Sequence, residues 1–420
     1  MFNSKKITNH AQQKGFAALF ITILVLAIIL GIALSIAILT LGEQKISRNI
    51  VKSSQAYYVA EAGIEDVLLR LSRIMKWSSS YQLNIGDNFS NIEISEAIGG
   101  TRTITSSGNV VNRIRKLEII YAIETTDVSF YYGAQVGDAG IKMENNSKII
   151  GNVFSNGSLN GDLPHVIIEG TIKVAEAGKK IEGATITQNA YGDICENSDI
   201  TGELHATTQI ECTYGSFISL TTPIDPLPLP ISSSQIEKWK AEAAVGGIIT
   251  GDYNLSGSAT ASLGPKKIEG NLIVQNNAIL TITGTLWVTG DIDIKNLAQV
   301  RLDAAIYGNT SGVIISDGLI MLQNDSISSG SGLSGSYLMY LSTAATNPAI
   351  NIKNNAKVDI LYTNTGWIKV ENNAAMRELT GYGIHIENNA TVTYEIGLQD
   401  AVFTSGAGGG WQVASWREIE

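Results

Sequence analysis

An uninterrupted apolar segment near the start of the chain is the strongest hydrophobic pattern in the sequence. From Phe16 to Leu41 no charged residue occurs, and the polar side chains there are three hydroxyls, at Thr22, Ser35 and Thr40. About 20 apolar residues are enough to cross the hydrocarbon of a bilayer as a helix. The segment therefore predicts a membrane-spanning helix, because the apolar part of a cleaved secretory peptide is much shorter.

The charges before this segment predict its orientation. Lys5, Lys6 and Lys14 precede the segment and no acidic residue does. Positively charged flanks stay on the cytoplasmic side of a membrane. We therefore expect residues 1–15 to remain inside and everything after Leu41 to be exported.

Beyond the membrane segment the hydrophobic pattern becomes one-sided. Apolar residues recur at the spacing of one helix face, at Ile50, Tyr57, Ile64, Leu68, Leu71 and Met75. The pattern predicts one continuous helix from Phe16 to about Trp77, roughly 90 Å long at about 1.5 Å per residue. Its outer half needs a surface to pack against.

Alternation of polar and apolar residues predicts a small sheet after the helix, within residues 78–132. It is clearest at Asn91–Ile94, Thr101–Thr105 and Lys116–Ile123, with glycine-containing turn signals between these runs. We expect this sheet to pack against the outer half of the helix.

Downstream of residue 132 the chain repeats a short motif centred on asparagine. Six copies stand at Met143–Ile149, Val274–Leu280, Ile294–Val300, Ile352–Val358, Val370–Met376 and Ile386–Val392. Leu322–Ser326, with Asn324, is a weaker seventh copy. With this copy included, the first asparagine of the motif recurs from Asn276 onward after 20, 28, 30, 18 and 16 residues. Such spacing is typical of β-solenoid coils with occasional longer loops.

Coil stacking explains why asparagine repeats. Neighbouring rungs of a parallel β-helix lie about 4.8 Å apart, so each position meets its own copy above and below. An asparagine amide both donates and accepts hydrogen bonds, and asparagine tolerates the left-handed conformation of a coil corner. The predicted column consists of Asn145, Asn276, Asn296, Asn354, Asn372 and Asn388. The alternative is an antiparallel sandwich with asparagine-containing hairpins.

An insertion interrupts the repeat at about residues 221–246. Four of the seven prolines of the chain lie in Thr221–Pro230, and proline cannot continue a central ladder. Residues Ser232–Ala244 follow as a predicted short helix with serine capping candidates. We expect the insertion to lie on the solenoid flank or to separate two halves of it.

Two cysteines, Cys195 and Cys212, lie close together in the exported part. An even count in an oxidising compartment favours a disulfide between them, and two free buried thiols are the alternative. A tetrahedral metal site would need four ligands, and only His205 lies near these cysteines. We therefore expect no metal and no cofactor.

Composition and motifs argue against two classes of function. The net charge is −10, and no basic cluster with interleaved aromatic residues occurs, so a nucleic-acid partner is not expected. Asp291 and Asp293 have a spacing that suits paired carboxylates or calcium, but exposed strand positions look the same. We expect no catalytic residues and no enzyme.

The N-terminal region resembles a known family. Lys14-Gly15-Phe16, the apolar helix and the run QAYYVAEAGIE at Gln55–Glu65 are similar to PilX-type pilus assembly proteins, minor pilins of the type IV pilus and type II secretion class. The resemblance covers residues 5–75. It implies a leader that a prepilin peptidase cuts after Gly15, which makes Phe16 the new N-terminus. Phe20 stands where major pilins usually have glutamate, so the resemblance favours a minor subunit.

Together these patterns predict an α+β pilin-like part, made of a long N-terminal helix and a small β-sheet, followed by an all-β parallel β-helix (β-solenoid) domain. The expected divisions are a leader at 1–15, the helix at 16–77, the small β region at 78–132 and the solenoid ectodomain at 133–420. The expected function is that of a structural minor pilin or pilus-assembly subunit. It would lie in the bacterial cytoplasmic membrane before assembly and on an extracellular filament at the cell surface afterwards.

The expected partners are other pilins through the N-terminal helix, the inner membrane and the prepilin peptidase. The solenoid is a candidate for cell adhesion to surface glycans or to host or abiotic surfaces. The alternative function is a permanently membrane-anchored surface adhesin or bactofilin-like scaffold. A polysaccharide-acting β-helix enzyme is a third and weaker alternative.

Overall fold

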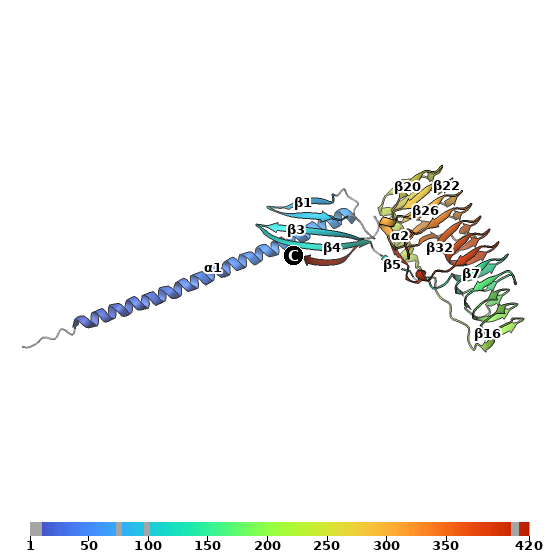
Figure 1. Cartoon of the computed structure of the whole chain (residues 1–420), viewed down its shortest axis with the longest axis horizontal. Helices are drawn as coiled ribbons and strands as arrows, with labels where there is room; N and C mark the ends of the chain where they lie inside the picture. Colours follow the sequence, from blue (N-terminus) through green and yellow to red (C-terminus); the bar gives the residue numbers. More distant parts are fainter. Residues whose placement is uncertain are drawn as a thin grey trace, which may run out of the picture.

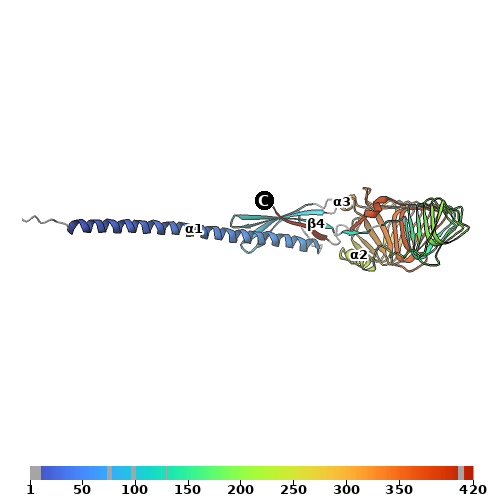
Figure 2. The same ribbon diagram turned by 90° about the horizontal axis from the view of Figure 1, so that it is seen from below.

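The structure, a computed structural model, describes residues 11–72, 78–95, 101–123, 125–128, 130–404 and 411–419. A long helix leads to a small antiparallel sheet, and a solenoid of parallel strands follows at the far end (Figure 1). A view turned by 90° shows the same three parts in succession (Figure 2). The predicted fold class, a pilin-like α+β part followed by a β-solenoid, is confirmed.

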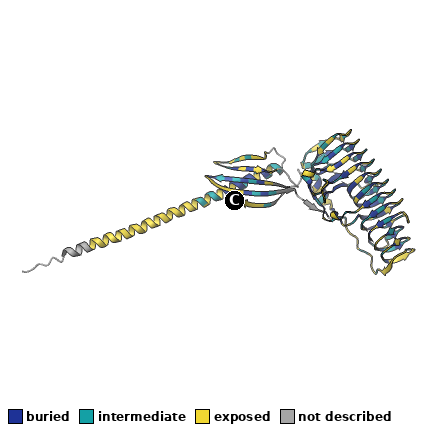
Figure 3. Ribbon diagram, in the orientation of Figure 1, coloured by how far each residue is buried: buried dark blue, intermediate teal, exposed yellow. Residues whose placement is uncertain are grey.

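Helix α1 runs without interruption over Ala11–Ser72, a length of 62 residues. Its first part projects free of the other elements, and only its last part is buried against the sheet (Figure 3). The sequence predicted a helix end at about Trp77, and residues 73–77 lie outside the described part of the chain.

The small sheet has the strand order β1-β2-β3-β4-β36 and is antiparallel throughout. Its strands are β1 (Ser80–Ile85), β2 (Asn88–Ile94), β3 (Thr101–Val110), β4 (Arg113–Ile123) and β36 (Trp411–Ile419). The fifth strand corrects the sequence-based assignment of all residues after 132 to the solenoid. Strand β36 returns to cover the free edge of β4, and the pair of Arg417 with Glu118 joins the two strands. The solenoid is therefore an insertion between two strands of this sheet.

The solenoid consists of two halves. The strands of the first half are β6 (Ala134–Met143), β7 (Lys148–Ile150), β8 (Val153–Ser155), β9 (Leu159–Asn160), β10 (Ile167–Glu169), β11 (Ile172–Val174), β12 (Lys180–Glu182), β13 (Thr185–Ile186), β14 (Ala190–Glu196), β15 (Asp199–Ile200), β16 (Glu203–Ile210) and β17 (Ser216–Ser219). Those of the second half are β18 (Ile248–Thr250), β19 (Tyr253–Leu255), β20 (Thr260–Leu263), β21 (Lys266–Glu269), β22 (Leu272–Gln275), β23 (Ile279–Ile282), β24 (Leu286–Val288), β25 (Ile292–Lys295), β26 (Gln299–Leu302), β27 (Gly312–Ser316), β28 (Ile320–Leu322), β29 (Ile327–Ser329), β30 (Leu338–Ser342), β31 (Ile350–Ile352), β32 (Lys357–Val370), β33 (Ala375–Ile386) and β34 (Thr391–Thr393).

The chain does not pass through the stack in sequence order. It enters at β6, in the middle of the stack, and winds to one end at β17. It then restarts at the other end with β18 and winds back. The last coil, β33 and β34, stacks in parallel on the entry coil, β6 and β7. We call this contact between the two halves the seam.

The proline-rich insertion runs along the flank of the solenoid and joins the two halves. On the first half, the side-chain amide of Gln135 donates to the carbonyl oxygen of Pro228 at 2.8 Å. On the second half, the Tyr362 hydroxyl donates to the carbonyl oxygen of Ile231 at 2.8 Å. Helix α2 (Ser233–Val245) follows, with Ser232 as its N-cap. The insertion thus both separates the halves along the chain and fastens them together in space.

Two apolar cores hold the solenoid together. The inner core fills the coils and is formed by alternate apolar residues of the strands, among them Leu272, Val274, Leu280, Ile282, Leu286, Val288, Ile292, Ile294, Val300 and Leu302. The outer core lies between one solenoid face, helix α2 and the segment with η1 (Ile396–Asp400) and β35 (Val402–Thr404). Strand β35 pairs with β5 (Thr125–Asp127), so the chain segments that enter and leave the solenoid run together. A further short helix, α3 (Ala304–Tyr307), places Tyr307 in the inner core.

Candidate functional site

The first part of α1 presents an apolar surface that no other element of the described structure covers. Residues 18–48 are all exposed, with Leu26 at 69% and Ile38 at 71% exposure. The best window of this helix has a mean hydropathy of 3.0 and is 0% buried, which makes it a candidate membrane span. Because water strongly disfavours so large an apolar patch, this surface requires lipid or other helices around it.

The three hydroxyls in this apolar segment are satisfied within the helix. Thr22, Ser35 and Thr40 donate to the backbone carbonyl oxygens of Leu19, Gly31 and Ile36, at 2.8–2.9 Å. Polar groups in hydrocarbon need such internal partners. The hydroxyls therefore add no unpaired group to a membrane-embedded helix.

The predicted cleavage site lies near the beginning of α1. Gly15 and Phe16 belong to the helix, which begins at Ala11, and the leader residues 1–10 lie outside the described part of the chain. Cleavage after Gly15 stays a prediction.

The second part of α1 packs closely on the sheet through small residues. A side chain at Gly63 would come within 2.3 Å of the Ser106 hydroxyl, and one at Gly108 within 2.1 Å of the Ala56 carbonyl oxygen. The Ser106 hydroxyl in turn donates to the carbonyl oxygen of Ala60 at 2.7 Å. The run at Gln55–Glu65 thus has a physical role, because its alanines and glycine let the sheet approach the helix backbone.

The predicted apolar stripe is only partly on this packed face. Ile64 is fully buried, and Tyr57, Leu68 and Leu71 pack at its edge, whereas Met75 lies outside the described residues. Ile50 is a correction, because it is 61% exposed. It lies where the helix leaves the sheet and lines a cavity of about 290 Å³ between α1 and the edge of the sheet.

The six predicted asparagines lie in one column along a solenoid corner, and Asn324 is a seventh member. In each neighbouring pair, Nδ2 of one asparagine donates to Oδ1 of the next at 2.8–3.1 Å. All seven have positive φ values of 54–58°, the left-handed region that asparagine tolerates. The column ends at Asn276, which donates to the Ser256 hydroxyl. Its amides bond mainly to one another, so its role is to fix the register of the coils.

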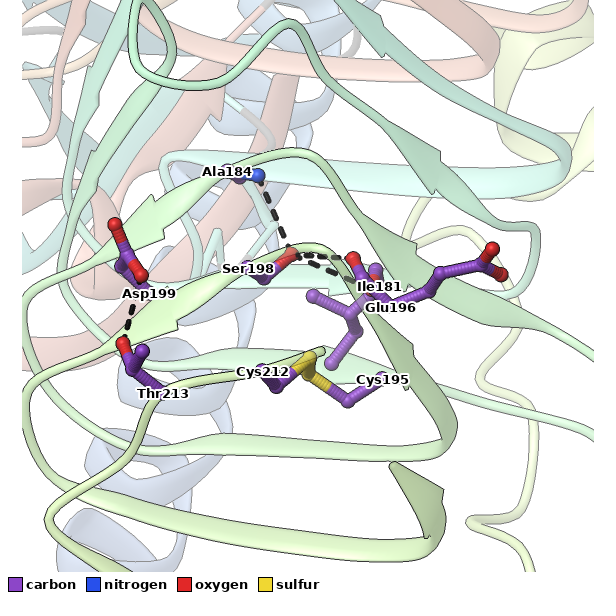
Figure 4. The surroundings of a disulfide bond; sticks show 8 residues. All are labelled: Ile181, Ala184, Cys195, Glu196, Ser198, Asp199, Cys212 and Thr213. Carbon is purple, nitrogen blue, oxygen red and sulfur yellow. Dashed lines mark hydrogen bonds between the residues drawn. A yellow bond between two sulfur atoms is a disulfide. The ribbon is translucent and has the colours of Figure 1, made fainter. Parts of the chain in front are cut away.

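Cys195 and Cys212 form a disulfide near the β17 end of the solenoid (Figure 4). Cys195 belongs to β14 and is fully buried. Cys212 follows β16, so the bond holds the terminal coil to the coil beneath it. His205 does not join them, because its ring stacks on Tyr191 at 4.3 Å and bonds to Glu203.

A ribbon of charged side chains crosses the seam. His385 Nε2 lies 2.8 Å from a Glu144 oxygen and 3.2 Å from a Glu387 oxygen. The candidate ligand atoms of these three residues lie within 4.8 Å of one another, close enough to share a metal ion. However, Lys142 pairs with Glu144 at 3.0 Å and Lys369 pairs with Glu387 at 3.0 Å. Lys142, followed by His385, lowers the pKa of Glu144. Because the positive charges of the two lysines repel a divalent metal ion, we describe the group as an ion-pair network.

The acidic residues that raised the question of catalysis have structural partners. Asp291 accepts from the backbone N–H of Leu319, and Asp293 pairs with Lys295. Asp303, another acid of this region, caps α3. No step of glycoside chemistry follows from these contacts.

The N-terminal region matches a protein family, and two solved structures are similar to the chain. Residues 14–65 match the family described as PilX N-terminal. A search of curated proteins gives no match. The competence-associated pilin ComZ from Thermus thermophilus is 11% identical, with a TM-score of 0.26 over 88% of this chain and 97% of that chain. An ice binding protein from an Antarctic bacterium, Flavobacteriaceae, is 12% identical, with a TM-score of 0.23 over 63% of this chain and 82% of that chain. Both TM-scores are too low to assign a fold, but the family match covers the exposed part of α1 and its small-residue contact with the sheet.

Proposed function

We propose that this chain, whose N-terminal region is type IV pilin-like, is a minor subunit of a type IV pilus-like filament and carries the solenoid as a headpiece outside the cell. The observation that carries the proposal is α1, a single helix that is bare and apolar over residues 18–41 and packed on the sheet at its other end. Lipid covers the bare part before assembly. Helices of neighbouring subunits cover it in the filament.

In this proposal a prepilin peptidase removes residues 1–15 and leaves Phe16 as the first residue. The chain then leaves the cytoplasmic membrane for the filament. It is a structural subunit without catalytic activity or cofactor.

The shape of the chain supports a position at the tip or a sparse place in the shaft. The solenoid is much broader than the helix that carries it (Figure 1). Neighbouring headpieces would collide if such subunits followed one another in a tightly packed shaft. The chain segments that enter and leave the solenoid pair with each other as β5 and β35, and the strands β4 and β36 on either side of them pair in the small sheet. This arrangement supports a headpiece held by two chain segments.

Recovery of the chain from sheared filaments tests this proposal. Leu26→Arg places a charge in the middle of the apolar segment, at a cost of about 2.5–3.5 kcal/mol for insertion. We expect the native chain and the control Leu26→Ala in the sheared filament fraction, and Leu26→Arg to be lost from it. If the native chain stays wholly in the cell membrane while filaments form normally, the permanently anchored surface protein is the correct function.

A further inference from the structure

A groove of the solenoid gathers charged, hydroxyl and aromatic side chains from coils close to the seam. Two adjoining cavities, of about 460 and 250 Å³, form it and share Ser329, Asp359, Arg377 and Glu395. These four residues come from four separate segments of the chain. We call this feature the Arg377 groove, and its volume is in the range of small-molecule sites.

Asp359 is a buried carboxylate that anchors one wall of the groove. It is only 5% exposed, and its Oδ2 accepts from the backbone N–H groups of Gly330 and Leu338 at 2.7 and 3.0 Å. Its Oδ1 accepts from Arg377 Nε at 2.9 Å. These contacts hold the serine- and glycine-rich segment 328–336 in place as one wall of the groove. Asp359 therefore fixes the shape of this wall.

Arg377 lies across the middle of the groove. Its guanidinium group lies 5.8 Å from the centroid of the Tyr337 ring, and its Nη1 pairs with Glu395. The Arg377 side chain is 45% exposed and that of Glu395 is 41% exposed. Both groups therefore combine a fixed position with access to solvent, as a binding site requires.

Tyr337 and Tyr394 form an aromatic wall of the groove, and this wall contains a hydroxyl without a hydrogen-bond partner in the described structure. Tyr337 is 2% exposed, and its hydroxyl has no hydrogen-bond partner among the residues that the structure describes. A buried hydroxyl without a partner is costly. Tyr394 and Met376 add apolar surface to the adjoining cavity.

The balance of charge indicates the class of ligand. The charged side chains that line the groove are two cations, Lys357 and Arg377, and two anions, Asp359 and Glu395. The two cations repel a metal ion, and the two carboxylates repel a phosphate or an acidic ligand, so the groove disfavours binding of either. Donors and acceptors stand side by side, and the hydroxyls of Ser329 and Thr393 lie in the same groove. A neutral molecule with many hydroxyl groups satisfies both kinds of partner, and its C–H faces suit the aromatic wall.

We propose that the Arg377 groove binds a neutral saccharide, with Arg377 and Glu395 bonded to sugar hydroxyls and Asp359 holding Arg377 in position. The biological use of this site, attachment of the headpiece to a polysaccharide surface, rests on the proposed function. The binding itself does not depend on filament assembly.

Calorimetric titration of the full chain in a sugar-free detergent tests the groove. The probes are cellohexaose, maltohexaose and chitin hexaose as neutral saccharides, polygalacturonate as the anionic probe and chitosan oligomers as the cationic probe. Thr393→Trp fills the rim, and Glu395→Gln removes one acceptor charge without changing the shape. Thr187→Trp is the matched control, because Thr187 is also exposed but lies outside the groove.

We expect at least one neutral hexaose to bind. Glu395→Gln should weaken its binding by about tenfold, the effect of one lost charged hydrogen bond, and Thr393→Trp should weaken it by blocking the rim, with Thr187→Trp unchanged. Absence of binding by every neutral probe, tighter binding of a charged probe, or unchanged binding by both groove variants would overturn the proposal. Shear fractionation of the same variants keeps the two proposals distinct. A chain that enters filaments but binds no neutral probe refutes the groove alone, whereas a chain that binds but never enters filaments refutes the proposed function alone.

Discussion

Asn145 and Asn388 are joined by a side-chain hydrogen bond of 3.0 Å, although 243 positions of sequence separate them. Asn145 belongs to the entry coil of the solenoid and Asn388 to its last coil, so this bond crosses the seam. The asparagine column therefore continues through a place where the chain itself does not. The two halves form one stack because the seam repeats the asparagine bond and the parallel strand pairing of the coil boundaries between Asn276 and Asn388.

Loss of one donor in the column is expected to weaken the stacking of the last coil, beside the seam, on the coil before it. Asn388→Asp keeps the shape and the left-handed conformation but removes the bond from Nδ2 to Asn372. We expect unfolding of the solenoid to become easier by about 1–3 kcal/mol, measured by chemical denaturation. Asn254→Asp is the control, since Asn254 is exposed on β19, and a surface change of this kind stays within about 0.5 kcal/mol. Equal effects of the two changes would contradict a structural role for the column.

The asparagine column and the inner core were predictable because both follow from a local repeat. The order of the coils was not, since no spacing in the sequence relates Asn388 to Asn145. Strand β36 was missed for the same reason: its partner β4 is about 300 residues away, and nothing local in 411–419 distinguishes a sheet strand from a solenoid strand. Ile50 was placed on the packed face because helix periodicity shows which side a residue is on, but not where the sheet ends.

The contact between α1 and the sheet gives a second prediction. Gly63→Ala places a methyl group within 2.3 Å of the Ser106 hydroxyl, and such overpacking costs about 1–3 kcal/mol. We expect faster hydrogen exchange in β2 and β3. Gly42→Ala is the matched control, because a side chain there meets nothing within 4 Å. Unaltered exchange in Gly63→Ala would show that the helix and sheet are not tightly packed.

Reduction of the disulfide is expected to loosen one end of the solenoid only. The bond between Cys195 and Cys212 closes a short loop, worth about 3 kcal/mol by chain entropy. Hydrogen exchange over residues 203–219 should therefore increase after reduction, and also in the Cys195→Ser, Cys212→Ser double variant. The opposite end, residues 248–263, provides the internal control. Equal loosening of both ends would mean that the bond stabilises the whole stack.

A buried carboxyl group predicts a pH dependence of stability. Glu378 is 0% exposed, its Oε2 has no partner within the described structure, and burial raises its pKa well above 4.5. A raised pKa favours the protonated form in the folded state. The contribution of Glu378 is therefore fully present below pH 4.5 and declines as pH rises through its folded pKa.

Replacement of Glu378 by glutamine mimics the protonated form. Glu378→Gln should raise the unfolding temperature at pH 7 and change it little at pH 4. Glu211→Gln, at an exposed position, should have little effect at either pH. A loss of stability at pH 7 in Glu378→Gln would mean that the charged form has a partner in the folded protein.

The Arg377 groove could not be predicted from the sequence. The role of the serine- and glycine-rich segment 328–336 as a wall of the groove depends on Asp359, which lies in another coil. Arg377 and Glu395 meet there through coil stacking and the segment after β34. Side chains from separate segments converge only after the stack has formed, so no local pattern marks them.

Mass spectrometry of the N-terminus of this chain, recovered from purified sheared filaments, shows whether the chain is a processed filament subunit. We expect a polypeptide that begins at Phe16 in the filament fraction. Absence of the chain from filaments, together with an intact leader beginning at Met1 in the membrane fraction, would contradict it.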